Sequence, residues 1–182
     1  TGWREIEGSL SRHSHLADDL ISEEEFDNFI LEFDYQIMPN ADSGVYFRAS
    51  EDEERGWMTG LELQLVDNAD PMYPQKTGWA TDLYQPANDP KTGQPLDVTK
   101  PAKQWNHVKL VCDGPHIEHW INGVKLVEYE VGSDDFNQRV AKSKFGGMPR
   151  FAKAESGFIA LQGDHGSVSF RNIKLRPIEA GR

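Results

Sequence analysis

The segment GLELQLVD, residues 60–67, carries two carboxylates at a spacing that suits acid–base chemistry on a glycosidic bond. On an extended strand Glu62 and Gln64 share one face, and Asp67 joins them only if a bulge or the strand end adds one residue. Two carboxylates within one sugar ring of each other can protonate a leaving oxygen and either attack the sugar or activate water. The alternative is that Glu62 and Gln64 form the wet face of an amphipathic strand and Asp67 begins a loop.

The preceding run, SGVYFRAS, places Tyr46 and Arg48 on one polar face of a second strand. If the two strands form a hairpin, the guanidinium of Arg48 would lie beside the Glu62 carboxylate. An arginine in that position can orient a sugar or stabilise an enolate oxygen. It can equally form a structural ion pair.

His165 lies in the short segment Asp164-His165-Gly166 between two expected strands. A tight loop can aim an imidazole, and the neighbouring carboxylate of Asp164 would orient it for proton transfer. The alternative is a histidine that stabilises the loop by hydrogen-bonding to the backbone.

The other histidines and the single cysteine, Cys112, do not have a spacing typical of zinc sites. His13-x-His15 can ligate metal on an extended segment but is expected to be a surface pair, and His116 and His119 fall on opposite strand faces. We therefore predict no metal site and no cofactor, with a divalent cation left open. The P-loop, G-x-G-x-x-G and G-x-S-x-G patterns are absent, so phosphate transfer, dinucleotide redox chemistry and α/β-hydrolase catalysis lose their usual sequence support.

Five tryptophans and five tyrosines in an acidic chain favour a carbohydrate ligand, because flat aromatic faces pack on the C–H surfaces of sugars. Trp57, Trp79 and Tyr84 lie in or beside expected loops, and Trp79 and Tyr84 are assigned to sugar contacts together with Tyr46 and Gln64. The other three tryptophans are expected in the core or at strand ends: Trp3, Trp105 and Trp120.

Composition argues against a nucleic-acid partner, an internal disulfide and a membrane-spanning segment. Thirty Asp and Glu against nineteen Lys and Arg leave a formal charge of −11, which disfavours nucleic acid. One cysteine cannot form an internal disulfide. The chain has no apolar run near the roughly 18 residues that span a bilayer, so no membrane-spanning segment is expected. Composition leaves the oligomeric state open.

Alternation of apolar and polar residues with frequent turn signals predicts an all-β protein. The clearest strands are expected at 29–37, 44–48 and 60–67, as a meander between 105 and 130, and as a C-terminal pair around residues 164–166. Two stretches break the pattern: a long proline-containing loop over 68–104 and a short helix over 133–144 that begins at a serine cap. Together these elements fit one domain of 182 residues, a two-sheet jelly-roll sandwich whose curved outer face forms a groove.

Several blocks resemble the bacterial 3-keto-disaccharide hydrolase domain family. They are DSGVYFR (42–48), GLELQLVD (60–67), QWNHVKLVCDG (104–114), HWINGV (119–124), SKF (143–145) and GFIALQGDHGSVSFRNIKLRP (157–177). The resemblance covers nearly the whole chain and implies a concanavalin A-like jelly roll, acting on sugars oxidised at C3, often in exported bacterial proteins. Family members usually carry a segment ahead of Gly2-Trp3 that is missing here, as expected for a trimmed chain whose signal segment is absent. The family commonly has asparagine where this chain has Asp42, and the spacing E-x-Q-x-x-D departs from the E-x-D-x-x-E of laminarinase-type enzymes at Gln64 and Asp67.

The implied substrate suggests elimination. A C3 ketone acidifies the hydrogen on C2, so a base can remove it, the enolate can expel the C1 alkoxide, and hydration completes a net hydrolysis. This route needs a base, an oxyanion stabiliser and an acid for the leaving group. We assign Glu62 as base or acid, Asp67 or His165 as its complement, and Arg48 as the stabiliser.

Two other classes of function remain. A non-catalytic carbohydrate-binding module on the same sandwich would keep the aromatics and Gln64 but would not need Glu62. An acidic adhesion or partner-recruiting domain predicts an apolar surface patch and no groove.

Overall fold

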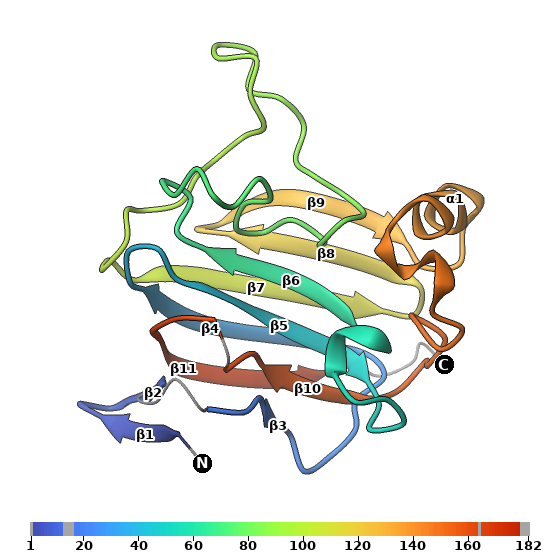
Figure 1. The fold of residues 1–182 in the computed structure, drawn as a ribbon, viewed down its shortest axis with the longest axis horizontal. Helices are drawn as coiled ribbons and strands as arrows, with labels where there is room; N and C mark the ends of the chain where they lie inside the picture. Colours follow the sequence, from blue (N-terminus) through green and yellow to red (C-terminus); the bar gives the residue numbers. More distant parts are fainter. Residues whose placement is uncertain (1, 13–16, 164, 179–182) are drawn as a thin grey trace.

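Two antiparallel sheets stack face to face in the computed structural model, which describes residues 2–12, 17–163 and 165–178 (Figure 1). The larger sheet has the strand order β1-β2-β11-β4-β7-β8-β9, and the smaller one has the order β3-β10-β5-β6. The strands are β1 (Trp3–Ile6), β2 (Ser9–Arg12), β3 (Leu20–Ile21), β4 (Phe29–Ile37), β5 (Asp42–Ala49), β6 (Leu61–Val66), β7 (Asn106–Asp113), β8 (His116–Ile121), β9 (Val124–Glu130), β10 (Phe158–Leu161) and β11 (Val168–Pro177). The predicted all-β, two-sheet jelly-roll sandwich is confirmed.

The core lies between the sheets because strands from both contribute alternate apolar side chains. In β4 every second residue from Phe29 to Ile37 is buried, and the residues between them are partly exposed. From the smaller sheet, Val45, Leu63 and Leu65 have no exposed surface. The clear alternation explains why β4 was predicted with its observed bounds, whereas the short strands β1, β2 and β3 were not predicted.

The predicted short helix is also present. It is α1 (Asp134–Lys142), and the Ser133 hydroxyl accepts a hydrogen bond from the Phe136 amide at 3.1 Å, as a capping serine does. Two 3₁₀ turns accompany it in the fold, η1 (Gly56–Met58) and η2 (Lys144–Gly147). No helix in the described ranges is both long enough and apolar enough to cross a bilayer.

The long segment between β6 and β7 is the predicted loop, and its central part projects past β9 (Figure 1). Its first part runs along the free edge of β6. The Gly78 amide donates to the Gln64 carbonyl at 2.8 Å, the Gln64 amide donates to the Trp79 carbonyl at 3.1 Å, and Leu63 pairs with Ala80. Residues 79–81 therefore extend the smaller sheet beyond β6.

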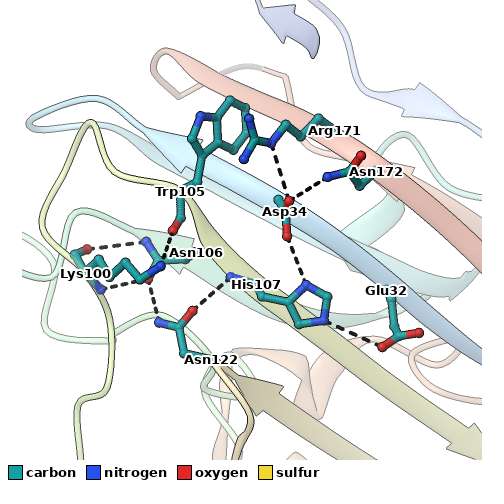
Figure 2. Close-up of polar contacts among 9 residues, drawn as sticks. All are labelled: Glu32, Asp34, Lys100, Trp105, Asn106, His107, Asn122, Arg171 and Asn172. Atoms are coloured by element: carbon teal, nitrogen blue, oxygen red, sulfur yellow. Dashed lines mark hydrogen bonds and ion pairs between the residues drawn. The ribbon is translucent and has the colours of Figure 1, made fainter. Parts of the chain in front are cut away.

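Asparagines hold the last part of this loop against the larger sheet (Figure 2). The Asn106 side-chain oxygen accepts from the Lys100 amide at 2.7 Å and from the Asn122 amide group at 2.8 Å. Asn122 also donates to the Val98 carbonyl at 2.8 Å. These bonds satisfy backbone groups of a segment that has no strand partner.

Candidate functional site

The outer face of the smaller sheet carries the polar side chains of three neighbouring strands. In the β5–β6 pair, Tyr46 lies opposite Glu62 and Gly44 lies opposite Gln64. The Thr81 amide donates to the Glu62 carbonyl at 3.3 Å, so Thr81 lies on the far side of Glu62. Register alone thus brings these side chains to one surface.

A cleft of about 280 Å³ opens on this surface, and we call it the Glu62 cleft. Its lining residues are Asp42, Tyr46, Trp57, Glu62, Gln64, Tyr73, Pro74, Gln75, Thr81, Lys144, Gln162 and His165. Four residues assigned from the sequence, Tyr46, Glu62, Gln64 and His165, therefore meet in one cleft. Their chemical roles stay predictions.

Gly44 makes room for the Glu62 carboxyl group. A Cβ built on Gly44 would clash with Glu62 Oε1 and would lie 3.1 Å from its Cγ. The carboxyl group therefore lies across the adjacent strand and is 9% exposed. Only a residue without a side chain allows this position.

Side-chain hydrogen bonds fix Gln64 at the base of the cleft. The Thr81 hydroxyl donates to Gln64 Oε1 at 2.9 Å, and Gln64 Nε2 donates to Asp42 Oδ1 at 2.6 Å. Both ends of the amide are occupied, so its orientation is set before a ligand binds. Such preorganisation reduces the ordering cost of binding.

Burial raises the pKa of Glu62 to about 7. The charge of Lys144 and a hydrogen bond from Thr81 lower it, whereas the carboxylates of Asp42 and Asp82 raise it further. Burial disfavours the ionised carboxylate because a site of low polarity solvates charge poorly. A carboxyl group that titrates near neutral pH is suited to general base or acid catalysis.

Gln162 and His165 form the opposite side of the cleft. The Gln162 amide nitrogen lies 3.4 Å from His165 Nδ1, and the His165 carbonyl accepts from the Asp42 amide at 2.9 Å. With the amide as donor, Nδ1 accepts, and the proton of the neutral ring is on Nε2. Gln162 Oε1 is buried and has no hydrogen-bond partner among the described residues. After a small rearrangement it can accept a hydrogen bond from a ligand hydroxyl. Asp164, the expected orienting partner of His165, lies outside the described residues.

Asp67 is not in the Glu62 cleft, contrary to expectation. The β5–β6 register runs without a bulge, so Asp67 stays in phase with the buried leucines rather than with Glu62. Its carboxylate accepts from the amides of Asn40 and Ala69, both at 3.2 Å. It stabilises the turn that follows β6, and the second carboxylate of the cleft is Asp42 instead.

Arg48 also lies away from Glu62, and the sequence-based placement is wrong. Its φ of 50° reverses the strand alternation, and the β10–β5 register shifts at the same point. Nη2 donates to the carbonyls of Asp27 at 3.0 Å and Gly114 at 2.6 Å. The cation that the cleft does contain is Lys144.

Trp79 and Tyr84 line an adjoining hollow rather than the cleft itself. The Tyr84 ring is stacked on Tyr129 with centroids 4.7 Å apart, and the Arg139 guanidinium carbon lies 4.4 Å from its centre. Its hydroxyl donates to Asp135 at 2.8 Å. The ring is thus already packed, which argues against sugar stacking on Tyr84.

Several residues of the cleft had no role in the sequence analysis, among them Asp42, Thr81, Lys144 and Gln162. The family blocks DSG, SKF and LQG contain Asp42, Lys144 and Gln162. These blocks indicated family membership, but they did not indicate where the three side chains lie. Thr81 had no signal, since it depends on how the loop runs along β6.

Another polar cluster lies on the outer face of the larger sheet (Figure 2). His107 Nδ1 is 2.9 Å from Asp34 Oδ1, and Nε2 is 3.6 Å from Glu32. Partial burial raises the pKa of Asp34, but hydrogen bonds from His107, Asn172 and Arg171 outweigh it and lower that pKa. Nearly half of the His107 and Glu32 side chains is exposed, as in a surface network that joins strands.

His116, Glu118 and Glu128 offer ligand atoms that all lie within 4.8 Å of one another. Lys125 Nζ already contacts Glu118 at 3.0 Å and Glu128 at 2.6 Å, so a cation would have to displace it. His13 and His15 lie outside the described residues.

Comparison with known proteins identifies the family. The model of the 3-keto-alpha-glucoside-1,2-lyase-like domain matches residues 1–176. The chain belongs to this family. A protein from Bacteroides thetaiotaomicron named 3-keto-disaccharide hydrolase is 25% identical over 185 residues, which cover 88% of this chain and 62% of that protein. The chain thus spans about three fifths of the length of that relative.

Solved structures agree with the family fold. Two candidate glycosyl hydrolases from Parabacteroides distasonis superpose with TM-scores of 0.86 and 0.76, at 23% and 26% identity. The first match covers 98% of this chain and 84% of that one, and the second covers 97% and 90%. The carbohydrate-binding module CBM66 from Bacillus subtilis has a TM-score of 0.57 at 13% identity, over 96% of this chain and 90% of that module. That likeness shows the sandwich alone.

Proposed function

We propose that this chain cleaves the glycosidic bond of 3-keto-glycosides by eliminating the aglycone and then hydrating the sugar product. The observation that carries the proposal is a buried carboxyl group, Glu62, whose pKa lies near 7 in a cleft lined by amides, hydroxyls and aromatic rings. Family membership supplies the substrate class.

Glu62 acts as the base. Its carboxylate takes the proton from C2, and the electrons of the C–H bond form the enolate of the C3 ketone. The enolate then collapses, the C1–O bond breaks, and the product is an enone with a double bond between C1 and C2. The protonated Glu62 gives its proton to the departing alkoxide. Glu62 then takes a proton from the water that adds to C1 of the enone and delivers it to C2, which completes a net hydrolysis and places a solvent proton on C2.

Lys144 takes the role that the sequence assigned to Arg48. Its ammonium group lines the cleft and acts on the Glu62 charge, so it can also stabilise an enolate oxygen that forms nearby. Asp82 Oδ2 lies 3.3 Å from Lys144 Nζ, and this ion pair holds the long lysine side chain in place.

His165 assists the departure of the leaving oxygen. The hydrogen bond between Gln162 and Nδ1 favours the tautomer with the proton on Nε2, and this N–H donates a hydrogen bond to the departing oxygen, which stabilises its developing negative charge. Asp67, the other candidate, is excluded from this role by its position outside the cleft.

Turnover of a 3-keto-glucoside with a chromogenic aglycone tests the proposal. Glu62→Gln should lower kcat by about 100-fold or more, the usual contribution of a general base. Glu32→Gln is the matched control, because it makes the same change on the outer face of the other sheet. Wild-type turnover should also incorporate solvent deuterium at C2.

Two outcomes contradict the proposal. If Glu62→Gln retains full turnover, Glu62 is not the base. If the wild type binds the sugar but releases no aglycone, the chain is a carbohydrate-binding module on the same sandwich. The presence of a polar cleft already argues against an adhesion domain that acts through an apolar patch.

A further inference from the structure

A cavity of about 470 Å³ lies at one end of the sandwich, and we call it the Arg48 cavity. It lies beside the turn between β7 and β8, where β9 ends and β4 begins (Figure 1). None of the described residues lines both this cavity and the Glu62 cleft. Its volume is within the range of sites that hold small molecules. The residues of its lining that matter below are Asp27, Arg48, Val131, Lys153, Ala154 and Glu155.

Arg48 brings a positive charge to this cavity without a counter-charge beside it. The residue is 5% exposed, and its Nη2 donates to two uncharged groups, the carbonyls of Asp27 and Gly114. Nε is buried and meets no acceptor among the described residues, and no ion pair joins Arg48 to a carboxylate in the same part of the chain. Burial of a charge costs solvation, so buried charges are normally paired. The missing counter-charge indicates an anionic ligand.

The charge of Arg48 acts on buried groups at this end of the core. Burial raises the pKa of Cys112 to about 12 and that of Tyr129 well above its ordinary value, and the positive charge of Arg48 opposes both shifts. A charge acts on such neighbours where water screens it poorly. An anion bound beside Arg48 would be attracted in the same weakly screened surroundings.

The chain adopts an uncommon backbone conformation at two residues of the lining. The φ of Arg48 is 50° and that of Ala152 is 53°, in the left-handed region that residues other than glycine rarely enter. At Arg48 this conformation turns the side chain away from the Glu62 cleft and toward the cavity. Gly157 packs against the bend, because a Cβ on it would lie 2.6 Å from the carbonyl carbon of Arg48. Such conformations persist where the surrounding structure fixes them, often at ligand sites.

Hydrogen bonds hold the walls of the cavity in place before a ligand binds. Asn28 Oδ1 accepts from the Gly114 amide at 2.6 Å, which joins the start of β4 to the turn after β7. The Ala152 amide donates to the Thr59 carbonyl at 2.8 Å and fixes the opposite segment. A space formed in advance lowers the ordering cost of binding.

The other charged residues of the lining favour a ligand with a single negative charge. Lys153, Asp27 and Glu155 are exposed, so they lie at the mouth of the cavity, whereas Arg48 lies at its base. The lysine attracts an anion, and the two carboxylates repel it. A doubly charged phosphate would meet about twice the repulsion that a carboxylate meets.

We propose that the Arg48 cavity binds an organic carboxylate with one negative charge and an apolar body. The planar guanidinium matches the two oxygens of a carboxylate, and a small shift of the side chain lets Nε take part. The body of the ligand packs on Val131, Ala152 and Ala154, which supply apolar surface. This site is separate from the Glu62 cleft, so the inference does not depend on the proposed function.

Titration with hexanoate, a carboxylate on a short apolar chain, tests the proposal by calorimetry and by the thermal midpoint of unfolding. Hexanoate should bind saturably to one site and raise the midpoint, because a ligand of the folded state stabilises that state. Hexanamide has the same shape without the charge and should bind about 10-fold or more weakly, as expected when a hydrogen bond loses its charge. Inorganic phosphate should also bind more weakly than hexanoate.

Three substitutions locate the site. Arg48→Met should abolish hexanoate binding, but it also removes two hydrogen bonds of the fold. Ala154→Phe leaves those bonds intact and fills the cavity, so it should abolish binding as well. Lys153→Met removes an exposed charge at the mouth and should weaken binding about 2- to 5-fold. Lys144→Met is the matched control, because it removes the cation of the Glu62 cleft and should leave the affinity for hexanoate unchanged.

Each of several results overturns the proposal. One is the absence of saturable hexanoate binding to the wild type, and another is equal binding of hexanoate and hexanamide. Hexanoate binding that survives in Ala154→Phe would show that the ligand lies elsewhere. Loss of binding in Lys144→Met would place the carboxylate in the Glu62 cleft instead.

Discussion

The carboxyl group of Glu62 occupies the space over Gly44 where any other residue would carry its Cβ. The two residues are on adjacent strands, and Gly44 lies opposite Gln64, so Glu62 leans diagonally across the sheet. Glycine is needed here for close approach and not for backbone freedom, because Gly44 is not among the residues with positive φ.

Gly44→Ala should therefore displace the Glu62 carboxyl group without breaking the strand. A shift of about 1 Å at a catalytic group can cost about 100-fold, so we expect kcat/KM to fall by about 10- to 100-fold. Gly147→Ala is the control, because a Cβ there meets no atom within 4 Å. Steady-state kinetics of both variants measure the effect, and unchanged kinetics in Gly44→Ala would show that the carboxyl position is unimportant.

The activity should depend on the ionisation of Glu62. With a pKa of about 7, the base is ionised only above neutral pH, so kcat/KM should rise with pH and level off above pH 7. Asp42→Asn removes a negative charge that raises this pKa, so the midpoint should move to lower pH. Lys144→Met removes a positive charge that lowers it, so the midpoint should move to higher pH. Shifts in the same direction would contradict the assignment of Glu62.

Glu62 should also destabilise the fold at alkaline pH. Its pKa is higher in the folded state than the ordinary 4.5, so its contribution to the free energy of unfolding is present below pH 4.5 and lost as pH rises through 7. The shift corresponds to about 3 kcal/mol. Glu62→Gln should therefore be more stable than the wild type at pH 8 by up to this amount, and no more stable at pH 4. Urea unfolding at the two pH values checks the difference.

His119 should have the opposite dependence. Burial lowers its pKa to about 4, so the neutral ring is favoured in the folded state. Its contribution to the free energy of unfolding is present above pH 6.5 and is lost as pH falls from 6.5 through 4. This loss amounts to about 3 kcal/mol. His119→Gln keeps a donor for the Gly78 carbonyl but does not titrate, so this loss should disappear. The free energies of unfolding of the wild type and His119→Gln are measured between pH 6.5 and 4. If they change in parallel with pH, the lowered pKa of His119 is contradicted.

Strands with strict alternation could be predicted from the sequence, and positions that depend on an irregular backbone could not. The nine residues of β4 alternate without interruption, so burial of every second side chain follows from the pattern. Arg48 continues the same alternation in β5, yet one residue with positive φ turns it away. The residue type does not indicate this positive φ, because arginine rarely adopts it.

The same difference between regular and irregular backbone decides which residues of the candidate site could be predicted. Tyr46, Glu62 and Gln64 were grouped correctly because a hairpin between regular strands fixes their common face. Lys144 and Thr81 reach the cleft from η2 and from the loop along β6, and such long-range contacts leave no periodic signal. Asp67 was misplaced because the sequence does not reveal whether a bulge is present.

The corrected position of Arg48 predicts a structural and not a catalytic phenotype. Arg48→Met removes the donors to the carbonyls of Asp27 and Gly114, so the free energy of unfolding should fall by about 1 to 3 kcal/mol. The kcat of the folded variant and its pH profile should stay close to those of the wild type, whereas loss of an oxyanion donor would lower kcat by about 100-fold or more. Lys144→Met is the matched comparison, because it removes a cation that does line the Glu62 cleft. Chemical denaturation and kinetics on both variants separate the two roles: a large loss of kcat with unchanged stability in Arg48→Met would return Arg48 to the active site.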